Sequence, residues 1–402
     1  MTDLAVLFEN LHPNSDGPLD EAGLAIERHL SALPPADLHA ALARALVAGI
    51  RSRTKMDEAA FAAAPGLQAL GCFCIGTNQV DLDAAASRGV PVFNAPFGNT
   101  RSVAELTLAS IIMLMRGIPA RSVAALKGEW RKSADGSHEV RAKKLGIVGY
   151  GNIGSQLSVL ASALGMHVFY YDVEPKLAHG NARRVDRLDD LLRLSDVVTL
   201  HVPDTERTRG MIGGYELALM KKGAMLINHA RGHLVDIDAL AASLRSGHIG
   251  GAAIDVFPVE PASKTERFET PLQAFENVIL TPHIGGSTQE AQAAIGDDVS
   301  MKLARYLAEG ATKGAVNLPE LDPGPIRNGR TRLLSIHGNA PGFLGRLNEA
   351  VSAAGANIAA QHLETRGEVG YVAADLEGDL PASFADHVKG LDGAIKTRLI
   401  AS

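Results

Sequence analysis

The glycine-rich segment of residues 149–154, Gly-Tyr-Gly-Asn-Ile-Gly, constrains the fold of this 402-residue chain more than any other. It follows a short apolar run, 145–148, and opens a stretch, 153–164, whose apolar residues recur with helical periodicity. The next apolar run, 167–171, ends beside the carboxylate of Asp172. A strand, a glycine turn, a helix, a second strand and an acid form the context in which this pattern indicates dinucleotide binding.

Each glycine of this turn has its own role in that interpretation. Gly149 permits the tight turn, Gly151 lets the backbone approach a pyrophosphate, and Gly154 allows close packing of helix on strand. The N-terminus of the helix offers free N–H groups and a positive dipole end to the phosphates. The alternative is a glycine turn that serves packing alone.

Asp172 bears on the choice of cofactor. Its carboxylate can accept hydrogen bonds from both ribose hydroxyls of NAD and would repel the 2′-phosphate of NADP. The residues that follow it are Val-Glu-Pro, with no arginine among them, so we expect NAD. An ordinary strand-end aspartate that caps a turn is the alternative.

The composition narrows the class of protein. Hydrophobic residues make up 46% of the chain and charged residues 21%, which is typical of packed globular domains. The net charge is −6 and no basic run occurs, which argues against a nucleic-acid partner. We find no signal-like N-terminus and no uncharged stretch of membrane-spanning length, so we expect a soluble, cytoplasmic protein without a membrane partner.

The hydrophobic pattern predicts an α/β fold with three parts. Between residues 144 and 282, six apolar runs alternate with helical patterns, which indicates a doubly wound parallel Rossmann-type sheet. These runs are 145–148, 168–171, 197–200, 224–228, 252–256 and 278–280. We assign residues 99–287 to this NAD-binding domain. Residues 1–98 show a similar rhythm and, with the long helical pattern that starts at residue 288, form a flavodoxin-like domain of residues 1–98 and 288–322.

A Pro/Gly-rich linker, 319–325, precedes a different pattern. The remaining segment reads as strand, helix, two strands, helix and strand, which predicts a small ferredoxin-like module over residues 330–402.

Three candidate catalytic residues follow predicted strand ends in the Rossmann-type domain: Arg231, Glu260 and His283. Ligands of open parallel sheets lie at this edge, so the three side chains can converge there. Oxidation of a secondary alcohol requires a base that titrates near neutral pH, as histidine does, and a carboxylate can orient its ring. Arginine can hold a substrate carboxylate through two hydrogen bonds. Taken singly, each residue also has an ordinary structural or surface explanation.

Longer motifs resemble those of the D-isomer-specific 2-hydroxyacid dehydrogenases. They lie at residues 254–261 (Ile-Asp-Val-Phe-Pro-Val-Glu-Pro) and 280–288 (Leu-Thr-Pro-His-Ile-Gly-Gly-Ser-Thr), with further matches at 50–54, 71–78 and 93–105. Within that family the chain is most similar to the shorter bacterial members that oxidise D-3-phosphoglycerate to 3-phosphohydroxypyruvate, the entry to L-serine synthesis.

The resemblance implies residue roles. Arg231, Glu260 and His283 become the catalytic set, and His229 departs from the small or apolar residue usual in the family. Besides the three glycines of the turn, the implied cofactor contacts are Asn152, Ile153, Asp172, His201, His229, Ala230, Arg231, Asp255, His283, Ile284, Gly285 and Gly286. The implied substrate contacts are Arg51, Ser52, Arg53, Asn99 and Lys132; solvated surface charges are the alternative for the cations. No metal is expected, because His229 and His233 lie in a loop without a third ligand.

The C-terminal module resembles an ACT domain, a regulatory unit for small ligands. The resemblance implies that L-serine binds at His337, Asn339 and Asn357 and inhibits the enzyme, and that the chain forms a homotetramer. A dimerisation module without an effector is the alternative. Two other functions stay open from the sequence: a reductase of 2-oxoglutarate, hydroxypyruvate or glyoxylate, and an NAD(H)-sensing binding protein without turnover.

Overall fold

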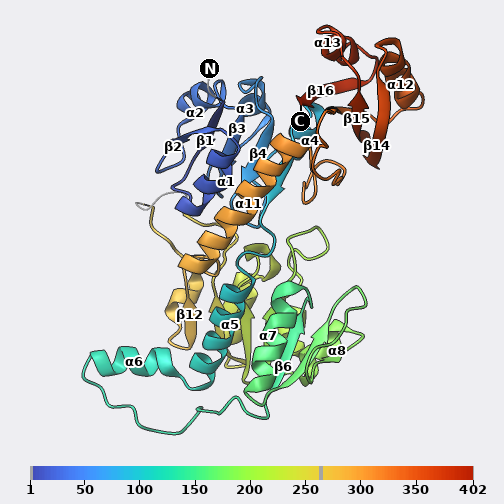
Figure 1. Cartoon of the computed structure of the whole chain (residues 1–402). Coiled ribbons are helices and arrows are strands. Elements are labelled where there is room, and N and C mark those ends of the chain that lie inside the picture. The colour runs from blue at the N-terminus through green and yellow to red at the C-terminus, as the bar shows by residue number, and fades with distance from the viewer. Residues whose placement is uncertain (1–2, 262–265, 402) are drawn as a thin grey trace. The chain divides into compact units, whose positions relative to one another are not determined.

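A computed structural model describes residues 3–261 and 266–401. The chain separates into two compact units. One unit runs up to Gly98 and continues from Gln292, and the other comprises Asn99–Ala291. Both units contain parallel sheets, and the first also carries an antiparallel sheet, so the α/β class predicted from the sequence is confirmed (Figure 1).

The N-terminal part of the first unit is a five-stranded parallel sheet with the strand order β2-β1-β3-β4-β5, which is the flavodoxin-like order. Its strands are β1 (Leu4–Leu7), β2 (Ala25–Arg28), β3 (Val47–Ile50), β4 (Ala69–Cys72) and β5 (Val92–Asn94). Its helices are α1 (Asp16–Glu21), α2 (Pro35–Leu42), α3 (Glu58–Ala62) and α4 (Leu82–Ser87). The hydrophobic pattern missed β2, because this edge strand has exposed ends and lacks an apolar run.

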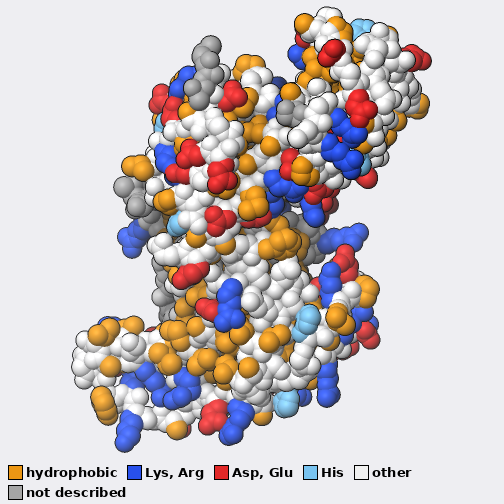
Figure 2. All heavy atoms as spheres, in the orientation of Figure 1, with side chains coloured by type: hydrophobic (Ala, Val, Ile, Leu, Met, Phe, Trp, Pro, Cys, Tyr) orange, Lys and Arg blue, Asp and Glu red, His pale blue; other side chains and the backbone are white. Residues whose placement is uncertain are grey.

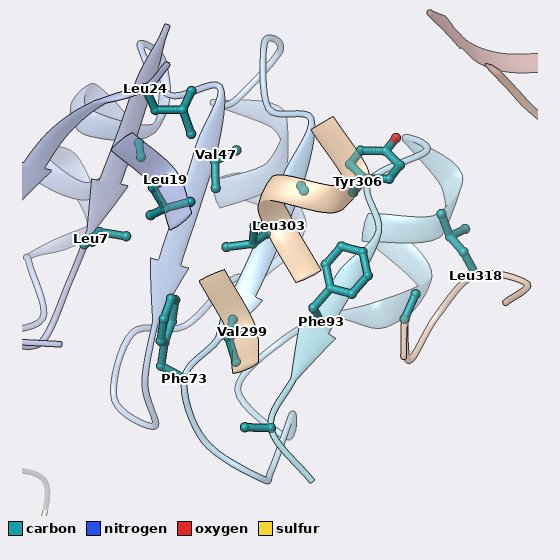
Figure 3. Packing of buried hydrophobic residues seen from close by; sticks show 14 of the residues in the cluster. Leu7, Leu19, Leu24, Val47, Phe73, Phe93, Val299, Leu303, Tyr306 and Leu318 are labelled. Carbon is teal, nitrogen blue, oxygen red and sulfur yellow. The ribbon is translucent and has the colours of Figure 1, made fainter. Parts of the chain in front are cut away.

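The long helix α11 (Gln289–Glu309) covers one face of this sheet. Figure 3 shows Val299, Leu303 and Tyr306 of α11 beside Phe73 and Phe93, which come from the sheet side of the same core. The rings of Phe93 and Tyr306 have centroids 6.1 Å apart. The long helical pattern predicted from residue 288 is therefore a helix that packs on the first sheet.

The C-terminal module is a four-stranded antiparallel sheet with the order β14-β15-β13-β16. Its elements are β13 (Thr331–Gly338), α12 (Phe343–Ala353), β14 (Asn357–Arg366), β15 (Val369–Glu377), α13 (Phe384–Lys389) and β16 (Ala394–Ala401). The predicted ferredoxin-like pattern is confirmed. Arg332 of β13 is 1% exposed; it pairs with Asp375 and donates to the carbonyl oxygens of Glu309 and Gly324, which joins the module to the end of α11.

The second unit contains a seven-stranded parallel sheet with the order β12-β11-β10-β9-β6-β7-β8. Its strands are β6 (Lys144–Val148), β7 (His167–Tyr171), β8 (Arg183–Arg184), β9 (Val197–Leu200), β10 (Ala224–Asn228), β11 (Ile249–Ile254) and β12 (Val278–Leu280). The six predicted strands are present, although the strand predicted at 252–256 begins at Ile249 and ends at Ile254. The seventh strand, β8, has two exposed residues, so no hydrophobic pattern marks it.

Helices cover both faces of this sheet, as a doubly wound fold requires. One core cluster contains residues of α5 (Thr100–Met115) and α7 (Asn152–Ala163), and the other contains residues of α8 (Leu188–Leu194), α9 (Gly214–Leu219) and α10 (Ile237–Arg245). The remaining helix, α6 (Ile118–Leu126), carries exposed apolar side chains, and Figure 2 shows hydrophobic atoms gathered around α5, α6 and α7.

Among the described residues, no single helix is long and apolar enough to cross a membrane. The helices α5 and α6 reach the required length only together, and they are bent by 69° at their junction.

Candidate active site

The carboxyl ends of three neighbouring strands lie level with one another. Asn228, at the end of β10, pairs with Ile254, at the end of β11, and Ile254 pairs with Leu280, at the end of β12. Arg231 and His283 each follow three residues after such an end, and Glu260 follows six residues after its strand. The strand register therefore delivers all three predicted catalytic residues to one edge of the sheet.

His283 and Glu260 form a direct pair. Nδ1 of His283 lies 3.0 Å from Oε1 and 2.9 Å from Oε2 of Glu260, and the N–H of Phe257 donates to the same carboxylate at 3.2 Å. His283 has a φ of 54°, and its N–H donates to the carbonyl oxygen of Asp255 at 2.8 Å. This left-handed backbone is rare for a residue with a side chain, and such strain is retained where neighbouring contacts compensate for it.

The pair shifts the pKa of both partners. The hydrogen bond to Glu260 raises the pKa of His283 above its ordinary value of 6.5, against the opposing effects of burial and of the Arg231 charge. Burial would raise the pKa of Glu260, but the hydrogen bond and charge of His283, the N–H of Phe257 and the charge of Arg231 hold it below 4.5. A histidine whose ring is paired with a carboxylate in this way is suited to act as a general base.

Arg231 reaches this edge because two loops approach closely at Gly232. A Cβ on Gly232 would lie 2.1 Å from the carbonyl carbon of Phe257, so only glycine fits there. Nδ2 of Asn228 donates to the Arg231 carbonyl oxygen at 2.9 Å, and the guanidinium donates to the carbonyl oxygen of Ala230 at 2.7 Å. The structure thus brings a guanidinium, a carboxylate and an imidazole to one place.

Asp255 fixes the loop that carries His283. Its buried carboxylate accepts hydrogen bonds from the Thr281 hydroxyl at 2.5 Å and from the N–H groups of Ile284 and Gly285 at 2.8 Å each. Gly286 lies against Asn99, since a Cβ on this glycine would be 2.7 Å from Nδ2 of Asn99. The predicted run 283–286 therefore lies in contact with both Asp255 and Asn99. Thr281 is a further residue of this site that was not predicted, although its position directly after β12 was an available signal.

The glycine turn has the geometry expected of a phosphate site. Gly149 has a φ of 92°, and a Cβ there would lie 2.5 Å from the carbonyl oxygen of His201. A Cβ on Gly154 would lie 2.2 Å from the carbonyl oxygen of Gly149, so this position needs glycine for packing. A Cβ on Gly151 would meet no described atom within 4 Å, which leaves open space where a pyrophosphate would approach.

The first turn of α7 adds donors to this space. Gly151 is the N-cap of the helix and supplies no side-chain hydrogen bond. The N–H groups of the first turn, including those of Asn152 and Ile153, lack partners from the helical ladder and are suited to bind phosphate oxygens.

Asp172 stands beside the turn. Its Oδ2 accepts a hydrogen bond from the N–H of Tyr150 at 2.7 Å, and its Oδ1 accepts one from the N–H of Glu174 at 2.9 Å. The backbone thus holds the carboxylate at the end of β7, one strand away from the phosphate turn, where a ribose hydroxyl would be met in this fold.

His229, which is buried, and His201, which is half-buried, lie near this edge of the sheet. Burial lowers the pKa of His229 to about 4, and burial and the nearby His229 lower that of His201 to about 3, so both rings are neutral at neutral pH. Nδ1 of His229 lies 3.2 Å from the Thr107 hydroxyl, and Nε2 of His201 lies 3.0 Å from the Thr199 hydroxyl. Nδ1 of His201 is buried and has no partner among the described residues, so it could bind a polar group of the cofactor.

The described residues contain no group of three histidine, cysteine or acidic side chains suited to hold a metal ion. Nδ1 of His233 lies 3.4 Å from the Asp204 carboxylate, whereas His229 contacts Thr107.

Comparisons with known proteins identify the family of the chain. Residues 108–285 match the family described as D-isomer specific 2-hydroxyacid dehydrogenase, NAD binding domain. D-3-phosphoglycerate dehydrogenase of Haemophilus influenzae is 52% identical over 396 residues, which cover 98% of this chain and 96% of that protein. The chain belongs to the D-isomer-specific 2-hydroxyacid dehydrogenase family.

Other relatives extend the comparison. D-3-phosphoglycerate dehydrogenase of Escherichia coli K12 is 51% identical over 398 residues, which cover 98% of this chain and 97% of that protein. The structure of D-lactate dehydrogenase from Aquifex aeolicus, complexed with NAD and lactic acid, has a TM-score of 0.68 and 28% identity, and it covers 79% of this chain and 100% of that one. As a member of the family, the chain is an NAD-dependent 2-hydroxyacid dehydrogenase.

The substrate residues implied by the family resemblance lie in both units. Arg51, Ser52 and Arg53 follow β3 at the carboxyl edge of the five-stranded sheet. Asn99 precedes α5, and its Oδ1 is buried without a partner among the described residues. Lys132 is exposed in the segment after α6, where it lines a hollow together with Gly117 and Trp130. In the part of the chain that the structure describes, no hydrogen bond or ion pair joins Lys132 to the His283–Glu260 pair.

Of the effector residues implied for the C-terminal module, His337 and Asn339 lie at one end of its sheet, whereas Asn357 lies on the edge strand β14 at the opposite end. Nδ1 of His337 donates to the carbonyl oxygen of Gly338 at 2.8 Å, which leaves Nε2 as an acceptor that is buried without a partner in the described residues. The His337 ring stacks on Phe343 with centroids 4.0 Å apart. Asn339 donates to the Gly367 carbonyl oxygen, and Asn357 begins the edge strand β14 and contacts Glu377.

Proposed function

We propose that this dehydrogenase oxidises D-3-phosphoglycerate to 3-phosphohydroxypyruvate, the first step of L-serine synthesis. The observation that carries the chemistry is the His283–Glu260 pair beside Arg231 at the carboxyl edge of an NAD-binding sheet. The substrate is supported by relatives that share about half of their residues over nearly the whole chain and are named for this reaction.

The chain's own residues act on the hydroxy acid as follows. Nε2 of His283 accepts the proton of the C2 hydroxyl, and Glu260 orients the ring and stabilises the imidazolium that forms. The guanidinium of Arg231 holds the substrate carboxylate and fixes C2 in place. Bound NAD supplies the acceptor for the hydride that leaves C2.

The phosphate of this substrate calls for further cations. We propose that Arg51, Ser52 and Arg53 bind the anionic substrate, together with Asn99 and Lys132. In support, the loop of the two arginines follows β3, next to the point between β1 and β3 where the strand order of the sheet reverses. Ligands of open α/β sheets bind outside the strands at such points.

A substrate panel tests the proposed function. Initial rates with NAD are measured for D-3-phosphoglycerate, D-glycerate, D-lactate and D-2-hydroxyglutarate, and in the reverse direction for the matching 2-oxo acids. The expected result is the highest kcat/KM with the phosphorylated pair. A higher value for an unphosphorylated acid would instead favour a reductase of that acid, and NAD binding without turnover would favour a sensor.

We further propose that L-serine binds the C-terminal module and inhibits the enzyme. The unpartnered Nε2 of His337 supports this, because it can accept a hydrogen bond from an ammonium or hydroxyl group. Titration of serine into the assay is expected to lower the rate, and His337→Ala is expected to abolish that response without changing the rate in the absence of serine. An unchanged rate at millimolar serine would remove the proposal.

We propose a cytoplasmic homotetramer. Two surfaces support self-association: the apolar patch of α6 and the following segment, where Leu126 is 86% and Trp130 is 87% exposed, and the open edge of β14. A second copy of the chain is the proposed partner of each. Light scattering is expected to give four times the chain mass, and Leu126→Glu is expected to reduce it. A monomeric wild-type protein would refute this.

A further inference from the structure

Glu9 has a strained backbone at the end of β1. Glu9 and Asn10 have φ angles of 67° and 51°, in the left-handed region that residues with side chains rarely adopt. Two such residues in succession cost conformational free energy, so the contacts that the turn permits must offset that cost.

Those contacts are three hydrogen bonds to one loop. Oε1 of Glu9 accepts from the N–H groups of Arg51 at 3.1 Å and Thr54 at 2.8 Å, and Oε2 accepts from the N–H of Arg53 at 3.0 Å. Converging backbone N–H groups form a concave anion site, and here the carboxylate of Glu9 fills it. On the other side of the loop, Nε2 of Gln79 donates to the carbonyl oxygen of Arg51 at 2.6 Å.

The carboxylate holds the loop backbone and leaves the guanidinium groups available. Among the described residues, neither Arg51 nor Arg53 forms an ion pair with Glu9 or with another carboxylate. The two cations therefore keep their charge for an anionic ligand, while the backbone that carries them is fixed from both sides.

We propose that Glu9 is a positioning residue for substrate binding. Its carboxylate fixes the loop 51–54 so that Arg51 and Arg53 are oriented before the anionic substrate arrives. This inference rests on the proposed function, which assigns both arginines to the substrate. Preorganised cations lose less conformational entropy on binding, so the effect falls on substrate affinity rather than on the chemical step.

Glu9→Gln is the sharpest test. The remaining amide oxygen can accept from two of the N–H groups. The amide NH₂ would face the N–H of Arg53, and because both groups are donors, no hydrogen bond can form between them. We expect KM for D-3-phosphoglycerate to rise roughly tenfold, with kcat and KM for NAD nearly unchanged. We also expect the preference over D-glycerate to fall by a similar factor, a readout that a general loss of stability would not move.

Glu27→Gln is the matched control. Glu27 lies in the same sheet and pairs with Arg44 and His29, away from the loop, so the same chemical change is expected to leave KM unchanged. If Glu9→Gln does not fold, Glu9→Asp keeps the charge but withdraws it from the loop, and we expect the same rise in KM.

A double-variant comparison separates this inference from the proposed function. If Glu9 acts through Arg53, Glu9→Gln is expected to add no further rise in KM to Arg53→Ala. A rise with Arg53→Ala but none with Glu9→Gln or Glu9→Asp would overturn the inference alone. No rise with Arg51→Ala or Arg53→Ala would remove the loop from substrate binding, and the inference with it.

Discussion

Nδ1 of His283 faces both carboxylate oxygens of Glu260, at 3.0 and 2.9 Å. An ionised carboxylate only accepts hydrogen bonds, so Nδ1 must carry a proton and Nε2 is the nitrogen left to act as a base. The left-handed backbone of His283, anchored to the Asp255 carbonyl oxygen, fixes the ring from the other side. One contact therefore decides the tautomer, the orientation and the pKa of the proposed base.

Glu260→Gln is expected to move the pH dependence of the reaction. The wild-type pKa of His283 lies above 6.5, and oxidation requires the neutral ring, so kcat/KM for oxidation rises as the pH passes through that raised value. Removing the carboxylate charge lowers this pKa, and the inflection is expected at a lower pH. Rate profiles from pH 5 to 9 check this; superimposable profiles would contradict it.

The same pair makes stability depend on pH. The raised pKa of His283 means that its contribution is complete below 6.5 and is lost as the pH rises through the folded-state value. The lowered pKa of Glu260 means that its contribution is complete above 4.5 and is lost as the pH falls through the folded-state value. Both contributions are complete between pH 4.5 and pH 6.5. The difference in Tm between wild type and Glu260→Gln is therefore expected to be largest in that pH range. A difference that grows steadily from pH 7 to 9 would refute this.

His283→Ala is expected to lower kcat by about 10²- to 10⁴-fold, because the proposed general base is lost. NADH binding, followed by fluorescence, is expected to stay nearly unchanged, since the His283 side chain pairs with Glu260 and we assign cofactor binding mainly to the glycine turn and Asp172. His167→Ala, at an exposed position that begins β7, is the control and should keep full activity. Near-normal turnover of His283→Ala would refute the assignment.

Two alanine variants of the glycine turn are expected to fail in different ways. Gly151→Ala places its methyl group in open space, so we expect a normal Tm but a KM for NAD raised by an order of magnitude or more. Gly154→Ala forces a methyl group against the Gly149 carbonyl oxygen, so we expect a loss of stability of roughly 1–3 kcal/mol as well. Equal effects of both variants on Tm would contradict this division of roles.

Asp172→Ala is expected to relax the preference for NAD over NADP. The variant removes a carboxylate that would repel a 2′-phosphate. Nη2 of Arg184 lies 3.5 Å from the Asp172 carbonyl oxygen, so its guanidinium is close enough to attract the 2′-phosphate of NADP. We expect kcat/KM with NAD to fall and that with NADP to rise, so that their ratio changes by at least about tenfold. An unchanged ratio would remove Asp172 from ribose recognition.

Strands with a continuous run of apolar residues could be predicted from the sequence, and strands without such a run could not. Runs such as 197–200 and 224–228 are buried on both faces and were located to the residue, whereas β2 and β8 lie at sheet edges and have exposed residues. Arg231, Glu260 and His283 could be predicted at one edge of the sheet from the sequence alone, because each follows the carboxyl end of a predicted parallel strand. No sequence period reveals the turn at Glu9, because its partners lie more than forty residues away.

The buried pair of Arg332 and Asp375 is expected to be a stability determinant of the C-terminal module. Asp375→Asn leaves a buried guanidinium without its counter-charge, so we expect a loss of about 3–5 kcal/mol in the free energy of unfolding by urea. Glu377→Gln is the matched control, because its pair with Arg330, the residue just before β13, is more exposed and is expected to contribute much less to stability. Replacing both partners, as Arg332→Met with Asp375→Leu, removes the unpaired charge and is expected to recover much of the loss, although Arg332 also donates to the Glu309 and Gly324 carbonyl oxygens. Equal losses for Asp375→Asn and Glu377→Gln would show that burial does not set the strength of this pair.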